Sequence, residues 1–136
     1  MIKSAEEFIR LRTSEVPEEY ERAANDTADI STWTELIENH SEFKEWVIHN
    51  KTVPIEILET LTLDNDSKIR SAVARKRKIN DKIFQTLSKD KDENVRYALL
   101  CNTNLAVDKL KLIETADSEW LTGQLNERIK GIENKA

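Results

Sequence analysis

Glycine and proline are scarce in this sequence, and that scarcity excludes several kinds of structure. The 136 residues include only two glycines and two prolines. Tight β-hairpin turns, dinucleotide-binding loops and phosphate-binding loops all need glycines at fixed positions. Both glycines, Gly123 and Gly131, lie late in the chain, so neither can serve a turn or loop in its first 120 residues. We therefore expect an all-α protein.

Cysteine and long apolar runs are also scarce. A single cysteine, Cys101, cannot form a disulfide within the chain, which indicates a reducing compartment or a chain indifferent to oxidation. A cytoplasmic location is the simplest prediction. No apolar run approaches the roughly 20 residues that span a bilayer. The acidic N-terminus lacks the basic and apolar regions of a signal peptide. We expect no membrane association.

Charged residues are abundant and unevenly distributed. They make up 35% of the chain, whose formal net charge is −5. Residues 1 to 66 hold 16 acidic and six basic side chains, whereas residues 67 to 82 hold one acidic and seven basic. Charge at this density is typical of helices with a solvated face, and the length predicts a single domain spanning residues 1–136.

An internal repeat of 26 residues is the strongest feature of the sequence. It is clearest where Asp66, Ile69, Arg70, Ala72 and Val73 recur as Asp92, Val95, Arg96, Ala98 and Leu99. Ahead of these, Ile57, Leu58 and Leu61 recur as Ile83, Phe84 and Leu87, and then as Lys109, Leu110 and Ile113. Asn50, Lys76 and Asn102 keep the same spacing, with Asn25 one residue out of step. About four units are visible between residues 25 and 130.

Each unit predicts two short helices that must pack on neighbouring units. The apolar residues of each segment lie three and four positions apart, on one helical stripe. Asp66, Asn80 and Asp92 are placed as N-caps, and Ser4 with Glu7 and Thr32 with Glu35 have capping-box spacing. We expect about ten helices and no sheet. Helices this short hold only in a stack, because no unit can bury its own apolar face.

The repeat resembles HEAT-like α-solenoid repeats. Asp-x-x-(Ile/Val)-Arg-x-Ala, at residues 66 to 72 and 92 to 98, is the motif that carries the resemblance, and the short unit is similar to bacterial leucine-rich repeat variants. The resemblance implies a right-handed α-α superhelix of about four two-helix repeats (25–130), with N-terminal cap helices (1–24) and a tail (131–136). It also implies that Arg70 and Arg96 pair with aspartates within and between units. The cysteines that bind a cluster beside some leucine-rich repeat variants are absent, so no iron–sulfur cofactor carries over.

A HEAT-like scaffold implies a non-catalytic protein-binding role. Outward positions of the second helices form columns that mix charged and aromatic residues, which often anchor interfaces. The small size and acidity suit a bacterial regulator or an immunity-type protein, acting as a monomer or weak dimer. The candidate partner-binding residues are Glu45, His49, Arg75, Arg77, Tyr97 and Trp120.

A basic run supports an alternative function. Clustered cations bind phosphates weakly and in a salt-dependent way, so residues 68 to 82 are a candidate nucleic-acid surface. Against this, the protein is acidic overall and aromatic residues for base stacking are missing from the run. The residues of this basic patch are Lys68, Arg75, Lys76, Arg77, Lys78 and Lys82.

Catalytic and metal-binding patterns are not found. His40 and His49 are nine residues apart, so they do not share a helix face, and no other ligand pair accompanies them. Cys101 has no histidine nearby in the sequence to activate it. We expect neither an enzyme nor a cofactor. Trp33 and Trp46 fall in apolar columns of the repeat, whereas Trp120 is expected at the surface.

Overall fold

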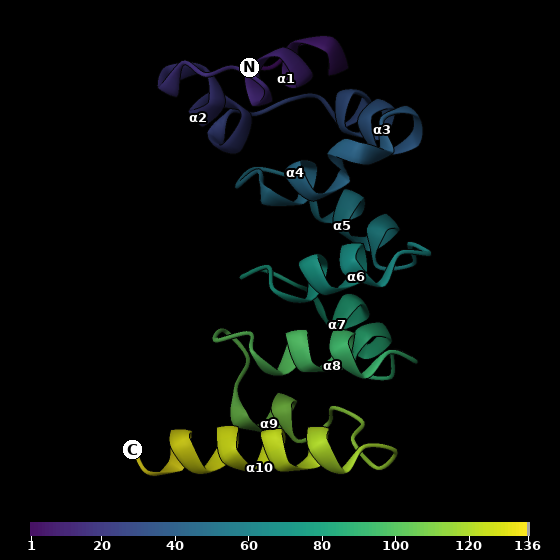
Figure 1. The fold of residues 1–136 in the computed structure, drawn as a ribbon, viewed down its shortest axis with the longest axis vertical. Helices are drawn as coiled ribbons and strands as arrows, with labels where there is room; N and C mark the ends of the chain where they lie inside the picture. Colours follow the sequence, from purple (N-terminus) through teal and green to yellow (C-terminus); the bar gives the residue numbers. More distant parts are fainter. Residues whose placement is uncertain (136) are drawn as a thin grey trace. The chain divides into compact units, whose positions relative to one another are not determined.

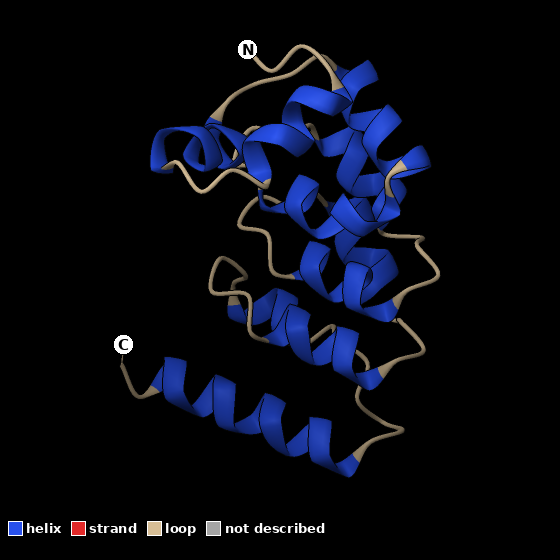
Figure 2. Ribbon diagram, turned by 45° about the horizontal axis from the view of Figure 1, so that its top comes forward, coloured by secondary structure: helices blue, strands red, loops and turns tan. Residues whose placement is uncertain are grey.

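The computed structural model describes residues 1–135 and is all-α over that range (Figure 2). It has ten α-helices, one short 3-10 helix and no strand among the described residues, which confirms the all-α prediction. One isolated parallel bridge joins Ile2 and Ala28. The helices are α1 (Ala5–Arg12), α2 (Pro17–Asn25), α3 (Ile30–Asn39), α4 (Lys44–His49), α5 (Ile55–Leu61), α6 (Ser67–Ala74), α7 (Asp81–Leu87), α8 (Glu93–Leu100), α9 (Val107–Leu110) and α10 (Glu119–Glu133), with the 3-10 helix at Ser41–Phe43.

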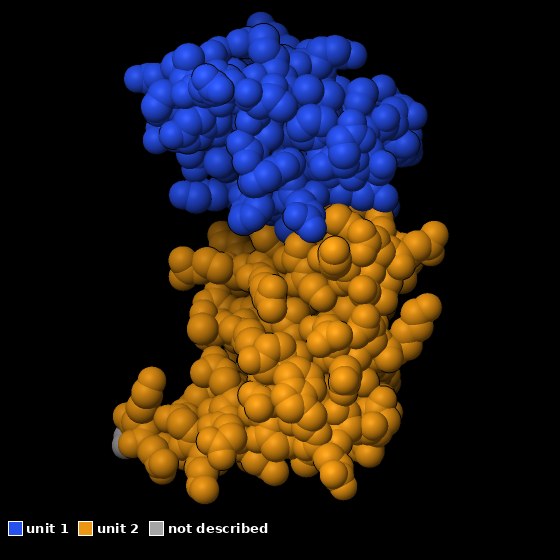
Figure 3. All heavy atoms as spheres, viewed as in Figure 1, with its two compact units in different colours: residues 1–60 blue, residues 61–136 orange. Residues whose placement is uncertain are grey.

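The chain divides into two compact units, Met1–Thr60 and the residues from Leu61 onward (Figure 3). Helices α1 to α4 and nearly all of α5 belong to the first unit, and α6 to α10 to the second. The cap expected at residues 1–24 corresponds to α1 and α2. The tail expected at 131–136 is in part helical, because α10 continues to Glu133, and Ala136 lies outside the described residues.

Aromatic and aliphatic side chains from α1, α3 and α4 form much of the core of the first unit. Phe8 of α1 meets Trp33 of α3 edge to face, with ring centroids 5.5 Å apart. Leu11, Leu36 and Val47 are fully buried around them. The prediction that Trp33 is a core residue is confirmed.

Consecutive helices pack on one another in the second unit (Figure 1). Helix α6 packs against α8, α8 against α10, and α7 against both α6 and α8. The apolar residues of the repeat columns in this unit are buried as the sequence predicts, except Ala72, which is half-buried. Leu121 and Leu125 of α10 are buried as well. Lys109, which interrupts one column, places its ammonium 4.9 Å from the centre of the Phe84 ring and pairs with Asp81. A cation therefore replaces an aliphatic contact at that position.

The N-termini of three repeat helices are capped as predicted. The side chains of Asp66, Asn80 and Asp92 accept hydrogen bonds from backbone N–H groups in the first turns of α6, α7 and α8. Ser4 caps α1 by accepting from the Glu7 N–H at 3.0 Å.

The predicted cap at Thr32 is wrong. Helix α3 starts at Ile30 with Asp29 as its N-cap residue, and the Asp29 carbonyl accepts from the Thr32 N–H at 2.9 Å. Thr32 therefore lies inside the first turn, where it is 7% exposed.

Two buried arginines tie successive repeats of the second unit together. Arg70 of α6 donates to both carboxylate oxygens of Asp90, at 2.8 and 3.2 Å, and to the backbone carbonyls of residues 64 and 65. Arg96 of α8 makes the equivalent bonds to Asp117, at 2.7 and 2.9 Å, and to the carbonyl of residue 114. The expected pairing between successive repeats is confirmed. The pairing expected within a repeat is wrong, because Asp66 and Asp92 cap their own helices and the two arginines bond other aspartates.

Buried asparagines make a second set of links between successive turns of the chain. Asn102 donates to the carbonyls of Ala74 and Lys76 at 2.9 and 2.8 Å. In the first unit, Asn50 donates in the same way to the carbonyls of Ala23 and Asp26. Asn25 does not continue the set, because it is exposed and its amide bonds to the Glu21 carbonyl within its own helix.

Candidate functional site

An aromatic pair marks the outward surface of the second unit. The rings of Tyr97, on α8, and Trp120, on α10, lie 4.9 Å apart and tilted by 41°. Trp120 is 46% exposed, as expected, and Tyr97 is half-buried. Such a pair offers a large apolar area with a polar edge, which is the composition of many interface anchors.

Arg75 and Cys101 complete this surface, which we call the Tyr97 surface. Arg75 follows the last residue of α6, and Cys101 follows the last residue of α8. A hydrogen bond with the Cys101 thiol raises the pKa of the Tyr97 hydroxyl, while the positive charge of Arg75 lowers it. The structure therefore brings together three predicted partner-binding residues, Arg75, Tyr97 and Trp120, with a free thiol beside them.

A second aromatic cluster lies in the first unit. Trp46 stacks on His49 at a centroid distance of 5.5 Å, and both come from one face of α4. The same ring contacts α1, because the guanidinium carbon of Arg12 is 3.4 Å from the centre of the Trp46 ring. Contacts of this kind contribute about 0.5 to 2 kcal/mol. Trp46 is 37% exposed, so it is not the core residue that its repeat column indicates.

A pocket of about 210 Å³ opens beside this cluster, and we call it the Arg12 pocket. It is formed by the last residue of α1, by one face of α2 and by one face of α4. Residues 20, 23 and 24 share the α2 face because they are three and four positions apart. Its lining residues are Arg12, Tyr20, Ala23, Ala24, Trp46 and His49.

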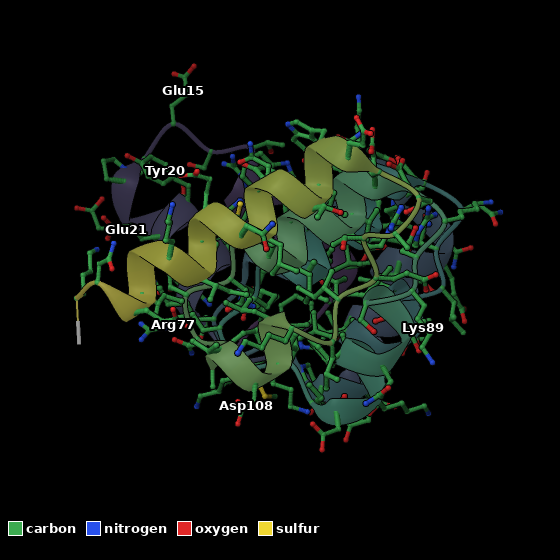
Figure 4. All side chains as sticks on the ribbon, turned by 90° about the horizontal axis from the view of Figure 1, so that it is seen from below. Glu15, Tyr20, Glu21, Arg77, Lys89 and Asp108 are labelled. Atoms are coloured by element: carbon green, nitrogen blue, oxygen red, sulfur yellow. The ribbon has the colours of Figure 1, made fainter. Side chains whose placement is uncertain are left out.

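Glu45 and Arg77 stand apart from these clusters. Glu45 is exposed on α4. Arg77 lies in the loop after α6, where its carbonyl accepts from the Asn104 side chain at 2.8 Å. Figure 4 shows Arg77 and Lys89 at opposite sides of the second unit. No interaction among residues 1–135 joins the Arg77 side chain to the Tyr97 surface.

The basic patch is less concentrated than the sequence indicates. Lys68 lies in the first turn of α6 and Arg75 after its last turn, and a helix of eight residues separates its ends by about 12 Å. Lys76 is half-buried, and this desolvation lowers the pKa of its ammonium group. Arg77, Lys78 and Lys82 are exposed. Arg70, which adds to the positive charge of the run, is buried and neutralised by Asp90.

Residues 1–135 offer neither a cluster of metal ligands nor a membrane-spanning helix. No group of three histidine, cysteine or acidic side chains in this range is placed to hold a metal ion. No helix in this range is both long enough and apolar enough to cross a bilayer.

Comparisons with known proteins identify no relative. The chain matches no protein-family model, no curated protein and no solved structure.

Sequence reasoning missed the Arg12 pocket. Arg12 and Tyr20 lie ahead of the repeats, so no column of equivalent positions drew attention to them. Two signals were available: the face of α2 that carries Tyr20 also carries two alanines, and the last turn of α1 ends in an arginine.

Proposed function

We propose that the chain is a right-handed α-solenoid of about four two-helix HEAT-like repeats behind N-terminal cap helices, and that it is a non-catalytic scaffold that binds another protein. Its size and acidity are those of a small bacterial regulator or immunity-type protein. The 26-residue repeat and the packing of consecutive helices in the second unit support the architecture.

The Tyr97 surface is the observation that carries the binding function. It combines a tyrosine, a tryptophan and an arginine, the three residue types that most often dominate interface energies. They come from three different helices or helix ends, held in place by the bonds of Arg70, Arg96 and Asn102. A rigid frame lowers the entropic cost of presenting such side chains to a partner.

The test combines partner capture with variants of this surface. The wild-type chain is used to capture a protein from its native cell, and binding is then measured with both proteins purified. Tyr97→Ala together with Trp120→Ala is expected to weaken binding at least about tenfold, since desolvated aromatic anchors contribute 2 kcal/mol or more. Leu63→Ala with Leu112→Ala is the matched control, because both leucines are exposed elsewhere on the second unit. Equal loss in both double variants would contradict the assignment.

The nucleic-acid alternative is tested separately by its dependence on salt. Retention on DNA or heparin is measured across salt concentrations for the wild type and for a variant with serine at residues 75 to 78. Phosphate binding through these cations predicts early elution of the variant and a smaller salt slope. We expect unchanged retention, because Lys76 is half-buried and Lys68 lies at the other end of α6.

A further inference from the structure

We propose that the Arg12 pocket binds a carboxylate group, with the Arg12 guanidinium as its principal contact. The site is separate from the protein contact proposed for the second unit and does not depend on it.

The first observation is that the polar groups lining the pocket are all hydrogen-bond donors or can act as donors. They are the guanidinium of Arg12, the hydroxyl of Tyr20, the indole N–H of Trp46 and the imidazole of His49. The remaining lining residues, Ala23 and Ala24, contribute small apolar side chains. The lining contains no carboxylate, so the pocket offers hydrogen bonds to an acceptor that it does not itself contain.

The second observation is that Arg12 has no acceptor of its own. Its Nε atom is buried without a hydrogen-bond partner, and no other bond or ion pair to the Arg12 side chain is found among the described residues. This is notable in a unit where residues 1 to 60 carry 14 acidic and six basic side chains. Arg10 and Arg22, in the same unit, are paired with Glu19 and Asp26. The first unit therefore satisfies its other arginines and leaves this one available.

The third observation is the orientation of the guanidinium. Its face rests on the Trp46 ring at 3.4 Å, and Trp46 also stacks on His49 at a centroid distance of 5.5 Å. A guanidinium that stacks on its face can still donate along its edge, where its N–H groups match the two oxygens of a carboxylate. Stacking also fixes the plane in advance, which reduces the ordering cost of binding.

The size of the pocket restricts the ligand. Its 210 Å³ is below the range of about 300 to 1,000 Å³ typical of drug-sized ligands, and equals the liquid volume of about seven water molecules. An aspartate or glutamate side chain, a chain-terminal carboxylate or a small organic acid fits this volume. Glu18 and Glu21 flank Tyr20 in the sequence of α2 and would repel further negative charge. The ligand should therefore carry one carboxylate and no other acidic group.

Nuclear magnetic resonance of the full chain tests the proposal. The Trp46 indole N–H and the Arg12 Nε–H resonances are followed during titration with three monocarboxylates that represent the three sources: propionate, acetyl-glutamate amide and acetyl-alanyl-alanine with a free C-terminus. Acetyl-glutamine amide has the shape of the glutamyl probe without its charge. We expect both resonances to shift with the acids, at affinities of about 1 mM, and not with the glutamine probe. The tightest of the three acids identifies the source.

Three variants separate binding from folding. Arg12→Gln removes the guanidinium, and Ala24→Leu fills the pocket while leaving Arg12 in place; each is expected to weaken binding at least about tenfold. Lys3→Gln removes one positive charge from the same unit outside the pocket, and should change affinity by less than about twofold. Melting midpoints confirm that each variant is folded. Equal shifts with the glutamine probe, no shift with any acid at about 50 mM, or full binding by folded Ala24→Leu would overturn the proposal.

Discussion

The two units of this protein use arginine in opposite ways. In the second unit, Arg70 and Arg96 are buried, and each bonds an aspartate and one or two backbone carbonyls from elsewhere in the chain. In the first unit, the Arg12 side chain lies on a tryptophan and has no hydrogen bond or ion pair in the described structure. The partners of an arginine, rather than its presence on a helix, therefore distinguish a structural residue from one available to a ligand.

The two units also differ in how regularly their helices are capped. In the second unit, α6, α7, α8 and α10 start at a side-chain cap and only α9 does not. In the first unit, Ser4 caps α1, but α2, α3 and α4 start without a side-chain cap bond. Four variant experiments test this contrast.

The largest expected difference is between Arg70→Ala and Arg12→Ala. Removing Arg70 leaves Asp90 buried without its cation, and breaking a buried pair from one side costs about 3 to 5 kcal/mol. Removing Arg12 costs less, about 0.5 to 2 kcal/mol, the value of a cation–π contact at a half-buried site. Denaturant unfolding of both variants measures the two free energies. Equal losses would show that the two arginines are equally structural.

A smaller difference is expected between Asn102→Ala and Asn25→Ala. Asn102 is buried and satisfies the carbonyls of Ala74 and Lys76, so its loss should cost about 1 to 3 kcal/mol. Asn25 is exposed and bonds only within its helix, so its loss should cost about 0.5 kcal/mol or less. Melting midpoints of the two variants provide the measurement. A larger shift for Asn25→Ala would place that residue in the set of buried links after all.

Substitutions at the N-cap positions should produce a smaller difference in unfolding free energy between the two units. Asp92 accepts from the Asn94 N–H at 2.8 Å, and replacing such a cap by alanine costs about 1 kcal/mol. Val16, at the N-cap position of α2, makes no such bond. Val16→Ala should therefore leave the unfolding free energy nearly unchanged. Equal effects of the two substitutions would count against a role for the Asp92 cap.

The smallest expected effect is on how the unfolding free energy changes at acidic pH. A hydrogen bond from Arg96 lowers the pKa of Asp117 below its ordinary value of 3.8. Because the pKa is lower in the folded state, the stabilisation is present above that value and is lost as the pH falls through the folded pKa. Asp117→Asn should therefore lower stability at neutral pH and converge with the wild type in acid.

Glu19→Gln provides the matched measurement in the first unit. Arg10 and Ser14 lower the pKa of Glu19, so the sign of the pH effect is the same. The effect should be smaller, because water screens the exposed guanidinium of Arg10. The guanidinium of Arg96 is buried and bonds both carboxylate oxygens of Asp117. Unfolding curves between about pH 3 and 7 compare the two. A larger pH effect for Glu19→Gln would reverse the contrast between the units.

Much of the second unit could be predicted from the sequence. The spacing of Leu87, Leu99 and Leu110 predicts burial, because residues at equivalent positions of a repeat meet equivalent neighbours. The caps at Asp66, Asn80 and Asp92 follow from local chemistry alone. Links made by Arg70 and Arg96 between successive repeats were expected, but the sequence did not identify Asp90 and Asp117 as their partners.

The features missed are those that depend on contacts outside the repeat. Trp46 occupies the column of Ala72 and Ala98, yet its ring is covered by Arg12, which belongs to a helix ahead of the repeats. Thr32 has the spacing of a cap, but α3 begins two residues earlier. The Arg12 pocket combines residues from three helices, and neither periodicity nor local propensity places those helices side by side.

The links between repeats also limit how this chain can change in length. Arg70 bonds an aspartate 20 residues later in the chain, and Arg96 bonds one 21 residues later. Asn102 donates to a carbonyl 28 residues earlier. A single inserted residue would move a donor away from its acceptor, whereas a duplicated module would bring a copy of both. Evolution or design can therefore lengthen the second unit by whole 26-residue repeats rather than by single residues.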